Sequence, residues 1–440
     1  MSIADIEADI SGTAGRARPD ACPGALQVHE AADGPLARVR LPGGAISAGQ
    51  LRELASCAVD LGSGVIELTS RANVQVRGLR SPAAFAERIA AAGLLPSAAH
   101  ERVRNIVASP LGGRIGLLGT QPLVEALDLA LCARPRLAEL PGRFLFAVDD
   151  GTGDTRALGA DVTFMPGATG GRLLLAGCDA GLTVPVGSAV QHLIAAAEVF
   201  LDERERGLSD RDRAAWRIAD LEDGGARIAE RLRATGTVSR PQADADPNPR
   251  PAASARPPQD GGPGAFERHA GRIAQQDGRV ALEAVVPLGR LSPAQAHAIA
   301  DAATSADQAA APTSGVEAGD STGAASTGDG VPIRFTPWRT VVLLDLAPTA
   351  ADRAAQALET AGLATDPGSP WAGVSACTGR PGCAKSLADV QEDARRWVAA
   401  LDGPPPAPVH WAGCERRCGL PRGRVVQMVA TATGYEERHQ

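Results

Sequence analysis

The sequence predicts an α+β fold with a pseudo-twofold internal repeat. Three observations support this prediction: the same order of strands and helices occurs in both halves of the chain, a Pro-rich segment separates the two copies, and 440 residues are enough for about three domains. The composition is that of an ordinary globular protein, with 44% hydrophobic and 22% charged residues. A small disulfide-stapled scaffold and a fibrous chain are therefore excluded.

The first copy of the repeat begins at residues 41–58. An extended entry leads to Ser47, a residue type that caps helix N-termini, and then to apolar residues at helical spacing. Residues 65–79 have the composition of a strand, and residues 82–92 predict a second helix. The first copy therefore predicts the order strand, helix, strand, helix, with a further strand expected.

The second copy repeats this order beyond the Pro-rich segment. Residues 286–303 contain Ser292 as the predicted cap and Pro293 at the first helical position, where the missing N–H costs nothing. Residues 332–346 predict the strand and residues 349–361 the second helix. Each copy alone would leave one sheet edge and one sheet face uncovered. Pairing the two copies across a pseudo-twofold axis would cover both.

Low-complexity composition sets the predicted boundaries, because such segments bury too little apolar surface to fold. The predicted order is a disordered N-terminus (1–20), a first half-domain (21–96), a first lobe (97–240), a Pro-rich linker (241–264), a second half-domain (265–366) with a disordered insertion (302–330), and a second lobe (367–440).

Charge and hydropathy exclude several classes of protein. A formal net charge of −7 argues against nucleic-acid binding, which needs a basic surface. No segment approaches the roughly 20 apolar residues of a membrane helix, and the first ten residues lack the basic start of a signal peptide. We expect a soluble cytoplasmic protein that binds neither nucleic acid nor membranes.

The eight cysteines fall into two groups. In the first group, Cys57 and Cys132 lie on predicted helices and are expected to be small buried side chains, whereas Cys22, in a Cys-Pro-Gly turn, could approach a site. The second group is C-terminal and has the spacing C-x5-C and C-x3-C, with Cys377, Cys383, Cys414 and Cys418 as its members.

The C-terminal cysteines favour a 4Fe–4S cluster. Disulfides are disfavoured in a reducing compartment, and structural zinc sites prefer tighter C-x2-4-C knuckles. Four thiolates on two Gly-rich loops suit the widely spaced corners of an iron–sulfur cubane and bring backbone N–H groups close to its sulfides. Zinc and structural thiols are the alternatives.

Five motifs carry a resemblance to a known family. They are LTSRANVQVRG (68–78), VRNIVASPLGGR (103–114), PGRFLFAVDDG (141–151), ACTGRPGCAKS (376–386) and GCERRCG (413–419). With the duplicated half-unit, these motifs resemble the siroheme-type sulfite and nitrite reductase superfamily over nearly the whole chain. The resemblance implies duplicated ferredoxin-like half-domains paired with two α/β nitrite/sulfite-reductase-type lobes, which hold a tetrapyrrole and the cluster between them.

The resemblance also implies a tetrapyrrole-binding set, which consists of Arg71, Arg104, Arg143, Asn73, Gln75 and Asn105. Arginine suits this role because a guanidinium binds a carboxylate through two parallel charge-assisted hydrogen bonds, and such a macrocycle carries many carboxylates. If siroheme is bound, Cys418 would be the thiolate nearest its iron.

One departure decides between branches of the superfamily. Sulfite and nitrite reductases bring two lysines to the substrate anion, and this chain has Arg143 and Leu145 at those positions. Lys385, the only lysine, lies in a cysteine loop. The chain therefore looks like the precorrin-3B synthase family, in which precorrin-3A is hydroxylated at C20 with O2 and closes a γ-lactone. A siroheme-dependent sulfite or nitrite reductase is the alternative, and a non-catalytic tetrapyrrole carrier is a third reading.

The expected cofactors follow from the same resemblance. They are a 4Fe–4S cluster and a mononuclear non-heme iron, for which the sequence shows no ligand set, while siroheme belongs only to the alternative. His410 is the one histidine near the cysteine loops, and we expect it to be structural. The run from Gly151 to Arg156 breaks the dinucleotide pattern G-x-G-x-x-G, so electrons are expected from an external ferredoxin or NAD(P)H reductase.

Overall fold

The computed structural model describes Asp20 and residues 22–168, 170–207, 210–234, 269–308 and 330–439. The predicted linker (241–264) and nearly all of the predicted disordered N-terminus (1–20) lie outside the described residues. In the part of the chain that the structure describes, no helix is long and apolar enough to cross a membrane.

Each repeat forms one five-stranded sheet. The first has the order β1 (His29–Ala31), β2 (Gly34–Val39), β5 (Val74–Val76), β4 (Ile66–Leu68) and β13 (Arg290–Leu291). The second has the order β11 (Gly271–Ala274), β12 (Val280–Val285), β15 (Thr340–Leu346), β14 (Ile333–Phe335) and β3 (Ala45–Ile46).

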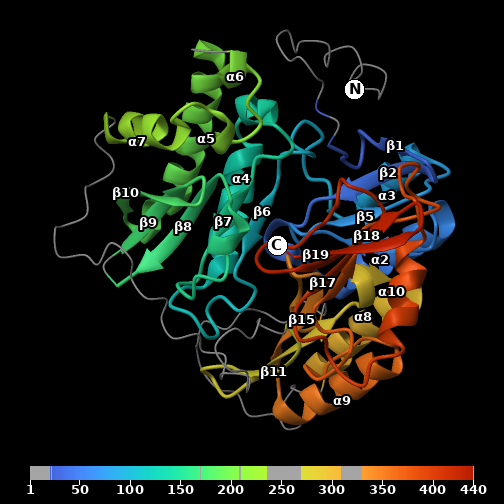
Figure 1. Ribbon diagram of the computed structural model, residues 1–440. Coiled ribbons are helices and arrows are strands. Elements are labelled where there is room, and N and C mark those ends of the chain that lie inside the picture. Colours follow the sequence, from blue (N-terminus) through green and yellow to red (C-terminus); the bar gives the residue numbers. More distant parts are fainter. Residues whose placement is uncertain are drawn as a thin grey trace, which may run out of the picture.

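The two repeats exchange their shortest strands. The two-residue strand β13 of the second repeat pairs with β4 of the first, and β3 of the first repeat pairs with β14 of the second. Each copy therefore covers an open sheet edge of the other, as the pseudo-twofold repeat predicted. Figure 1 shows the blue first repeat beside the yellow and orange second repeat.

The helices of the repeats begin within one residue of the predicted positions. They are α2 (Ala48–Leu61), α3 (Pro82–Ala91), α8 (Pro293–Gln308) and α9 (Pro348–Thr360). Ser47 caps α2 in a capping box with Gln50, and Ser292 makes the same pair of bonds with Gln295 at α8. The four helices and two sheets share one hydrophobic core.

The predicted strands at 65–79 and 332–346 were wrong as single strands, because each is a hairpin. In the first, the Thr69 hydroxyl accepts the N–H groups of Arg71 and Asn73, and Ala72 adopts a φ of 56°. In the second, Thr336 accepts from Trp338 and Thr340 in the same way, and Arg339 has a φ of 61°. These threonine turns contain neither glycine nor, in the first copy, proline, so the usual turn signals were missing.

The prediction that residues 302–330 are disordered was wrong for the first part of this segment. Helix α8 continues to Gln308, and residues 309–329 lie outside the described residues. The Ala-rich composition that predicted disorder also has the highest helix propensity. Ala303 and Ala306 are buried, so tertiary packing prolongs the helix.

The first lobe is a mixed sheet covered by helices. Its order is β10 (Cys178–Val184), β9 (Gly170–Leu175), β8 (Val162–Gly167), β7 (Phe146–Val148) and β6 (Ile106–Ala108), with β6, β7 and β8 parallel. Its helices are α4 (Thr120–Cys132), α5 (Ala189–Arg206), α6 (Asp210–Arg213) and α7 (Gly224–Ala234). This lobe is the green part of Figure 1.

The second lobe repeats the strand–loop–helix–strand order of the first. It contains β16 (Val374–Ala376), α10 (Val390–Val398), β17 (Val409–Ala412), β18 (Val426–Thr431) and β19 (Gly434–His439). Strands β16, β17 and β18 are parallel, and β19 is antiparallel.

Short 3-10 helices connect the elements outside this lobe. They occupy Pro42–Gly44, Pro135–Glu139, Arg156–Leu158, Val186–Ser188, Ile218–Asp220 and Pro287–Gly289.

Candidate functional site

The four C-terminal cysteines lie on two loops at one edge of the second lobe. Cys377 directly follows β16, and the loop after β17 carries Cys414 and Cys418. Because β16 and β17 are parallel neighbours, their carboxyl ends meet at the same edge of the sheet. The N–H of Gly413 donates to Cys377 Sγ over 3.2 Å, so a backbone donor already faces the sulfur.

The chemistry of these loops fits a bound metal cluster. Burial raises the pKa of Cys377 and of Cys418, and neighbouring cysteines raise both further because thiolate charges repel one another. A cationic metal centre removes this penalty by coordinating the thiolates. Gly413 allows the close approach, since a Cβ there would lie 1.9 Å from Ser386 Oγ.

Both repeats hold the cysteine loops in place. Arg77 pairs with Asp33 through two bonds and donates to the carbonyl of Gly382 over 2.6 Å. Arg339 of the second repeat donates to the carbonyl of Gly419 over 2.9 Å. The carbonyl partners lie next to Cys383 and Cys418, so the sheet domain fixes both loops.

His410 supports the loops from the buried side. Its Nδ1 lies 2.9 Å from Ser375 Oγ, and its Nε2 lies near the Cys418 backbone without a hydrogen bond of good geometry. Burial lowers the pKa of His410 to about 3, and the charge of Arg339 lowers it further. His410 is therefore a neutral side chain packed behind the cysteine loop.

A second group of side chains, Arg38, Arg40 and Arg71, forms an arginine site on the first repeat. Arg38 donates only to the Gln75 amide oxygen, and Arg71 only to the carbonyl of Gly142. Arg40 is 2% exposed and donates to the carbonyls of Arg102 and Pro23, while its Nη1 has no partner.

None of the three guanidinium groups forms an ion pair with a carboxylate among the described residues, although the charges of Glu67, Glu101 and Asp161 act on them from a longer distance. Burial lowers the pKa of Arg38, of Arg40 and of Arg71, the last to about 10, and the charges of Arg38 and Arg71 add to the effect on Arg40. Arg40 is buried and Arg38 and Arg71 are half-buried, and cations in such positions without a directly paired carboxylate destabilise a folded protein. The arrangement fits an anionic ligand that supplies the missing carboxylates.

Similar proteins place this chain in a known superfamily. The profile of the nitrite/sulfite reductase ferredoxin-like half domain matches residues 29–85. A ferredoxin–nitrite reductase of Synechococcus elongatus is 25% identical, covering 88% of this chain and 74% of its own length. A precorrin-3B synthase of Sinorhizobium is also 25% identical, covering 97% of this chain and 83% of its own length. The chain belongs to the nitrite/sulfite reductase superfamily.

Two further members of this oxidoreductase superfamily bear on the comparison. A sulfite reductase of Mycolicibacterium paratuberculosis is 28% identical over 83% of this chain, which spans 62% of that protein. The solved structure of Mycobacterium tuberculosis NirA matches with a TM-score of 0.68 at 23% identity, over 92% of this chain and 73% of its own. That match shows the α+β superfamily fold, as the repeat and motifs predicted.

Arg104 does not offer a free guanidinium. It is 5% exposed, and its Nε and Nη2 donate to the two carboxylate oxygens of Asp128 on α4, over 2.7 and 2.6 Å. With Arg40, it lines a cleft of about 160 Å³ against α4. This cleft is smaller than the pockets of roughly 300–1,000 Å³ that hold drug-sized ligands. The structure thus neutralises Arg104 internally.

The predicted amide side chains support the arginine site from within. Asn73 donates to Asn105 Oδ1 over 3.2 Å and accepts the N–H of Leu41. Asn105 donates to the carbonyl of Gly142, which is also the partner of Arg71. Gln75 links Arg38 to Glu67.

Arg143 and Leu145, which stand where sulfite and nitrite reductases have lysines, lie in different environments. Arg143 is exposed, and its guanidinium lies over the Trp216 ring at 5.4 Å from the centroid. Leu145 is 3% exposed and packs with Val107, Ala147 and Ala160. Arg143 therefore keeps a cation that lies over an aromatic ring, Leu145 offers none, and Lys385 lies exposed on the Cys383 loop.

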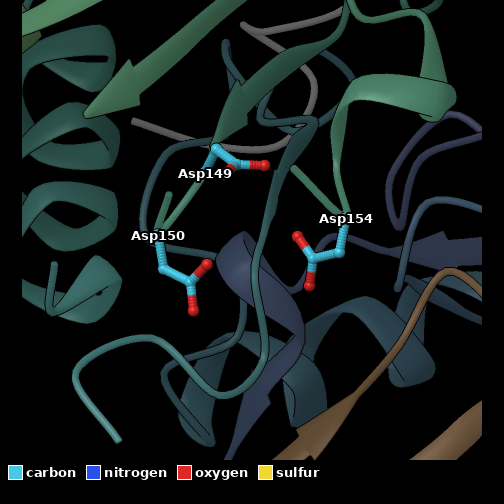
Figure 2. Close-up of side chains that lie close together, drawn as sticks. All are labelled: Asp149, Asp150 and Asp154. Atoms are coloured by element: carbon cyan, nitrogen blue, oxygen red, sulfur yellow. The ribbon is translucent and has the colours of Figure 1, made fainter. Parts of the chain in front are cut away.

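Sequence reasoning missed two groups of residues. Arg38 and Arg40 lie in the segment LARVRLPGG (36–44), where neither was predicted to bind a ligand, and their i, i+2 spacing on a strand places both side chains on one face. Asp149 and Asp150 lay in the motif PGRFLFAVDDG and Asp154 in the failed dinucleotide run, but none of the three was predicted to bind a ligand. Their carboxylates surround one space at the end of β7, as Figure 2 shows, each with an oxygen within 4.8 Å of the others. The run DDGTGD was the available signal.

Proposed function

We propose that this chain is a tetrapyrrole monooxygenase of the precorrin-3B synthase type. One atom of O2 enters the substrate as the C20 hydroxyl, and the other leaves as water with two protons and two electrons from an external reductant. A ring-A acetate then closes a γ-lactone. The substrate class rests on one observation, which is the arginine site: Arg40 is buried, Arg38 and Arg71 are half-buried, and none of them is bonded to a carboxylate among the described residues.

The arginine site would bind and orient the substrate. Arg38 and Arg71 each bond to one neutral acceptor and so keep further N–H groups for a ligand. Arg40 Nη1 has no hydrogen-bond partner at all. Each charge-assisted bond to a substrate carboxylate is worth roughly 1.5–3 kcal/mol. Asn73 and Asn105 would keep the Arg71 loop in position through Gly142.

Leu145 supports the oxygenase branch over the anion reductases. A reductase of sulfite or nitrite needs compact cations at the reacting anion and a route for protons. The Leu145 side chain instead lies in an apolar cluster, and Arg104 is neutralised by Asp128. Neither the Leu145 position nor Arg104 therefore offers a free cation to a small oxyanion.

A 4Fe–4S cluster held by Cys377, Cys383, Cys414 and Cys418 would supply single electrons when bound. The chain contributes the N–H of Gly413 beside Cys377 and the arginine anchors of both loops. Such donors stabilise a reduced, more negative centre.

The electron donor is proposed to be an acidic protein such as a ferredoxin. Lys385, Arg416 and Arg424 are exposed around the cysteine loops, and Cys418 is itself exposed. In a chain of net charge −7, this local excess of cations would steer a negatively charged partner to the cysteine loops.

The proposal is tested by anaerobic incubation with precorrin-3A followed by addition of reductant and O2. Mass spectrometry is expected to show a product that contains one oxygen atom from 18O2. The sulfite and nitrite reductases among its relatives make the siroheme reductase the second candidate. Siroheme absorbance together with sulfite- or nitrite-dependent oxidation of reduced methyl viologen would establish that candidate and overturn the oxygenase.

A further inference from the structure

The acidic loop of the first lobe occupies the place that a cysteine loop occupies in the second. Ser109 follows β6 and donates its N–H to the carbonyl of Val148 over 3.1 Å. Cys377 follows β16 and donates its N–H to the carbonyl of Trp411 over 2.9 Å. The first residue after each first strand is therefore equivalent in the two lobes.

The equivalence extends to the side chains. Asp150 N–H donates to Ser109 Oγ over 3.1 Å, as Gly413 N–H donates to Cys377 Sγ over 3.2 Å. The N–H of Leu117 donates to the carbonyl of Asp150, and in the second lobe the N–H of Leu387 donates to the carbonyl of Gly413. The two lobes thus present the same pair of loops, but with oxygen donors in one and sulfur donors in the other.

Asp149 accounts for the shape of the acidic loop. Its Oδ1 accepts the N–H groups of Gly151 and Gly153, and its Oδ2 accepts both the N–H and the hydroxyl of Thr155. Gly151 and Gly153 have φ values of 100° and 82°, which permit this tight turn. Asp149 is therefore satisfied by the protein.

Asp150 is not satisfied by the protein. It is fully buried, its Oδ1 accepts from Thr152, and its Oδ2 has no hydrogen-bond partner. Burial raises the pKa of this carboxyl, as does the charge of Asp149. A buried carboxylate oxygen without a donor is costly unless a proton or a cation occupies it.

The carboxylates of Asp150 and Asp154 face each other across the open centre of the group in Figure 2. Ser109 Oγ donates to Asp154 Oδ1 over 2.5 Å, so a hydroxyl oxygen lies beside the same space. All these donors are oxygens, and neither histidine nor cysteine belongs to the group. Oxygen-only donors select hard cations over zinc or copper.

We propose that Asp150 and Asp154 bind a hard divalent cation of the Mg²⁺ or Mn²⁺ type, with the charge of Asp149 behind them and water completing the shell. Two carboxylates are the usual protein contribution to such an ion. This site is separate from the cysteine loops and does not depend on the proposed oxygenase activity.

The test is a titration of the full chain, stripped with a chelator, with Mn²⁺ followed by electron paramagnetic resonance. One tight site is expected, with displacement by Mg²⁺ and, in a parallel anaerobic arm, by Fe²⁺. Asp150→Asn and Asp154→Asn should each weaken Mn²⁺ binding at least tenfold, whereas the exposed Asp277→Asn control and Cys377→Ser should leave it unchanged.

A second readout separates a ligand from a structural residue. Asp150→Asn keeps an oxygen for Thr152 and removes a buried charge, so it should stabilise the metal-free protein while abolishing the rise in thermal midpoint that Mn²⁺ gives the unmodified chain. Unchanged Mn²⁺ affinity in both aspartate variants, or no stoichiometric Mn²⁺ site in the unmodified chain, would overturn the proposal.

Discussion

Arg71→Met is expected to stabilise the unliganded protein and, at the same time, to weaken its binding of a tetrapyrrole polycarboxylate. In the free protein, burial and the charge of Arg217 lower the pKa of Arg71 to about 10. This lowering corresponds to roughly 3 kcal/mol of unfavourable free energy for the charged side chain.

The expected gain is smaller than this penalty because one hydrogen bond is lost. Arg71 donates to Gly142 O over 3.2 Å, a bond worth about 1 kcal/mol. Gly142 O keeps its bond from Asn105, so no orphaned carbonyl remains. The free energy of unfolding should therefore rise by about 2 kcal/mol. A lowered arginine pKa penalises the protonated form, so the penalty is present at all pH values below the folded pKa, and the gain should be constant between about pH 6 and 8.

The loss of affinity is estimated from the charge-assisted bond to the ligand. Removing one such bond, worth roughly 1.5–3 kcal/mol, should raise the Kd about 10- to 100-fold. Urea unfolding and fluorescence titration with uroporphyrin as the probe would measure the two effects. Arg395→Met, which removes an exposed pair with Glu392 on α10, is the control and should change both quantities little. Lower stability with unchanged uroporphyrin affinity would refute the reasoning.

Three further predictions concern single side chains. Replacing any of the four C-terminal cysteines with serine should abolish the cluster, whereas Cys57→Ala and Cys132→Ala should not, as measured by iron and sulfide content. Full iron and sulfide content in two of the four serine variants would contradict the ligand set. Leu145→Lys buries an ammonium and should lower the unfolding free energy by roughly 3 kcal/mol or more, while Leu129→Lys at a 73% exposed position should have little effect in the same urea assay. Burial raises the pKa of Cys57 to about 12, so its thiolate fraction at pH 8 is about 1 in 10,000. Iodoacetamide should therefore label the exposed Cys178 before Cys57, as followed by peptide mass spectrometry, and equal labelling of the two would show that Cys57 is accessible.

Local sequence patterns determined the helix starts and the repeat. Ser47 with Gln50 and Ser292 with Gln295 cap their helices through side chains three residues apart, so a short window contains the whole interaction. The spacing of the four cysteines likewise predicted two loops, since each pair lies on one short segment. The superfamily motifs were read from contiguous residues in the same way.

Tertiary structure alone decided the charge state and direction of the site residues. Arg104 finds Asp128 on α4, and Leu145 turns into an apolar cluster, although the sequence placed both in the predicted pocket region. Arg40 is unpaired only because the surrounding fold offers it carbonyl oxygens rather than carboxylates. The equivalence of Ser109 with Cys377 became visible only from matching strand ends, because the two lobes share backbone geometry and not residue type. Whether a polar side chain is satisfied depends on which distant segments the fold brings beside it, and a one-dimensional pattern does not contain that information.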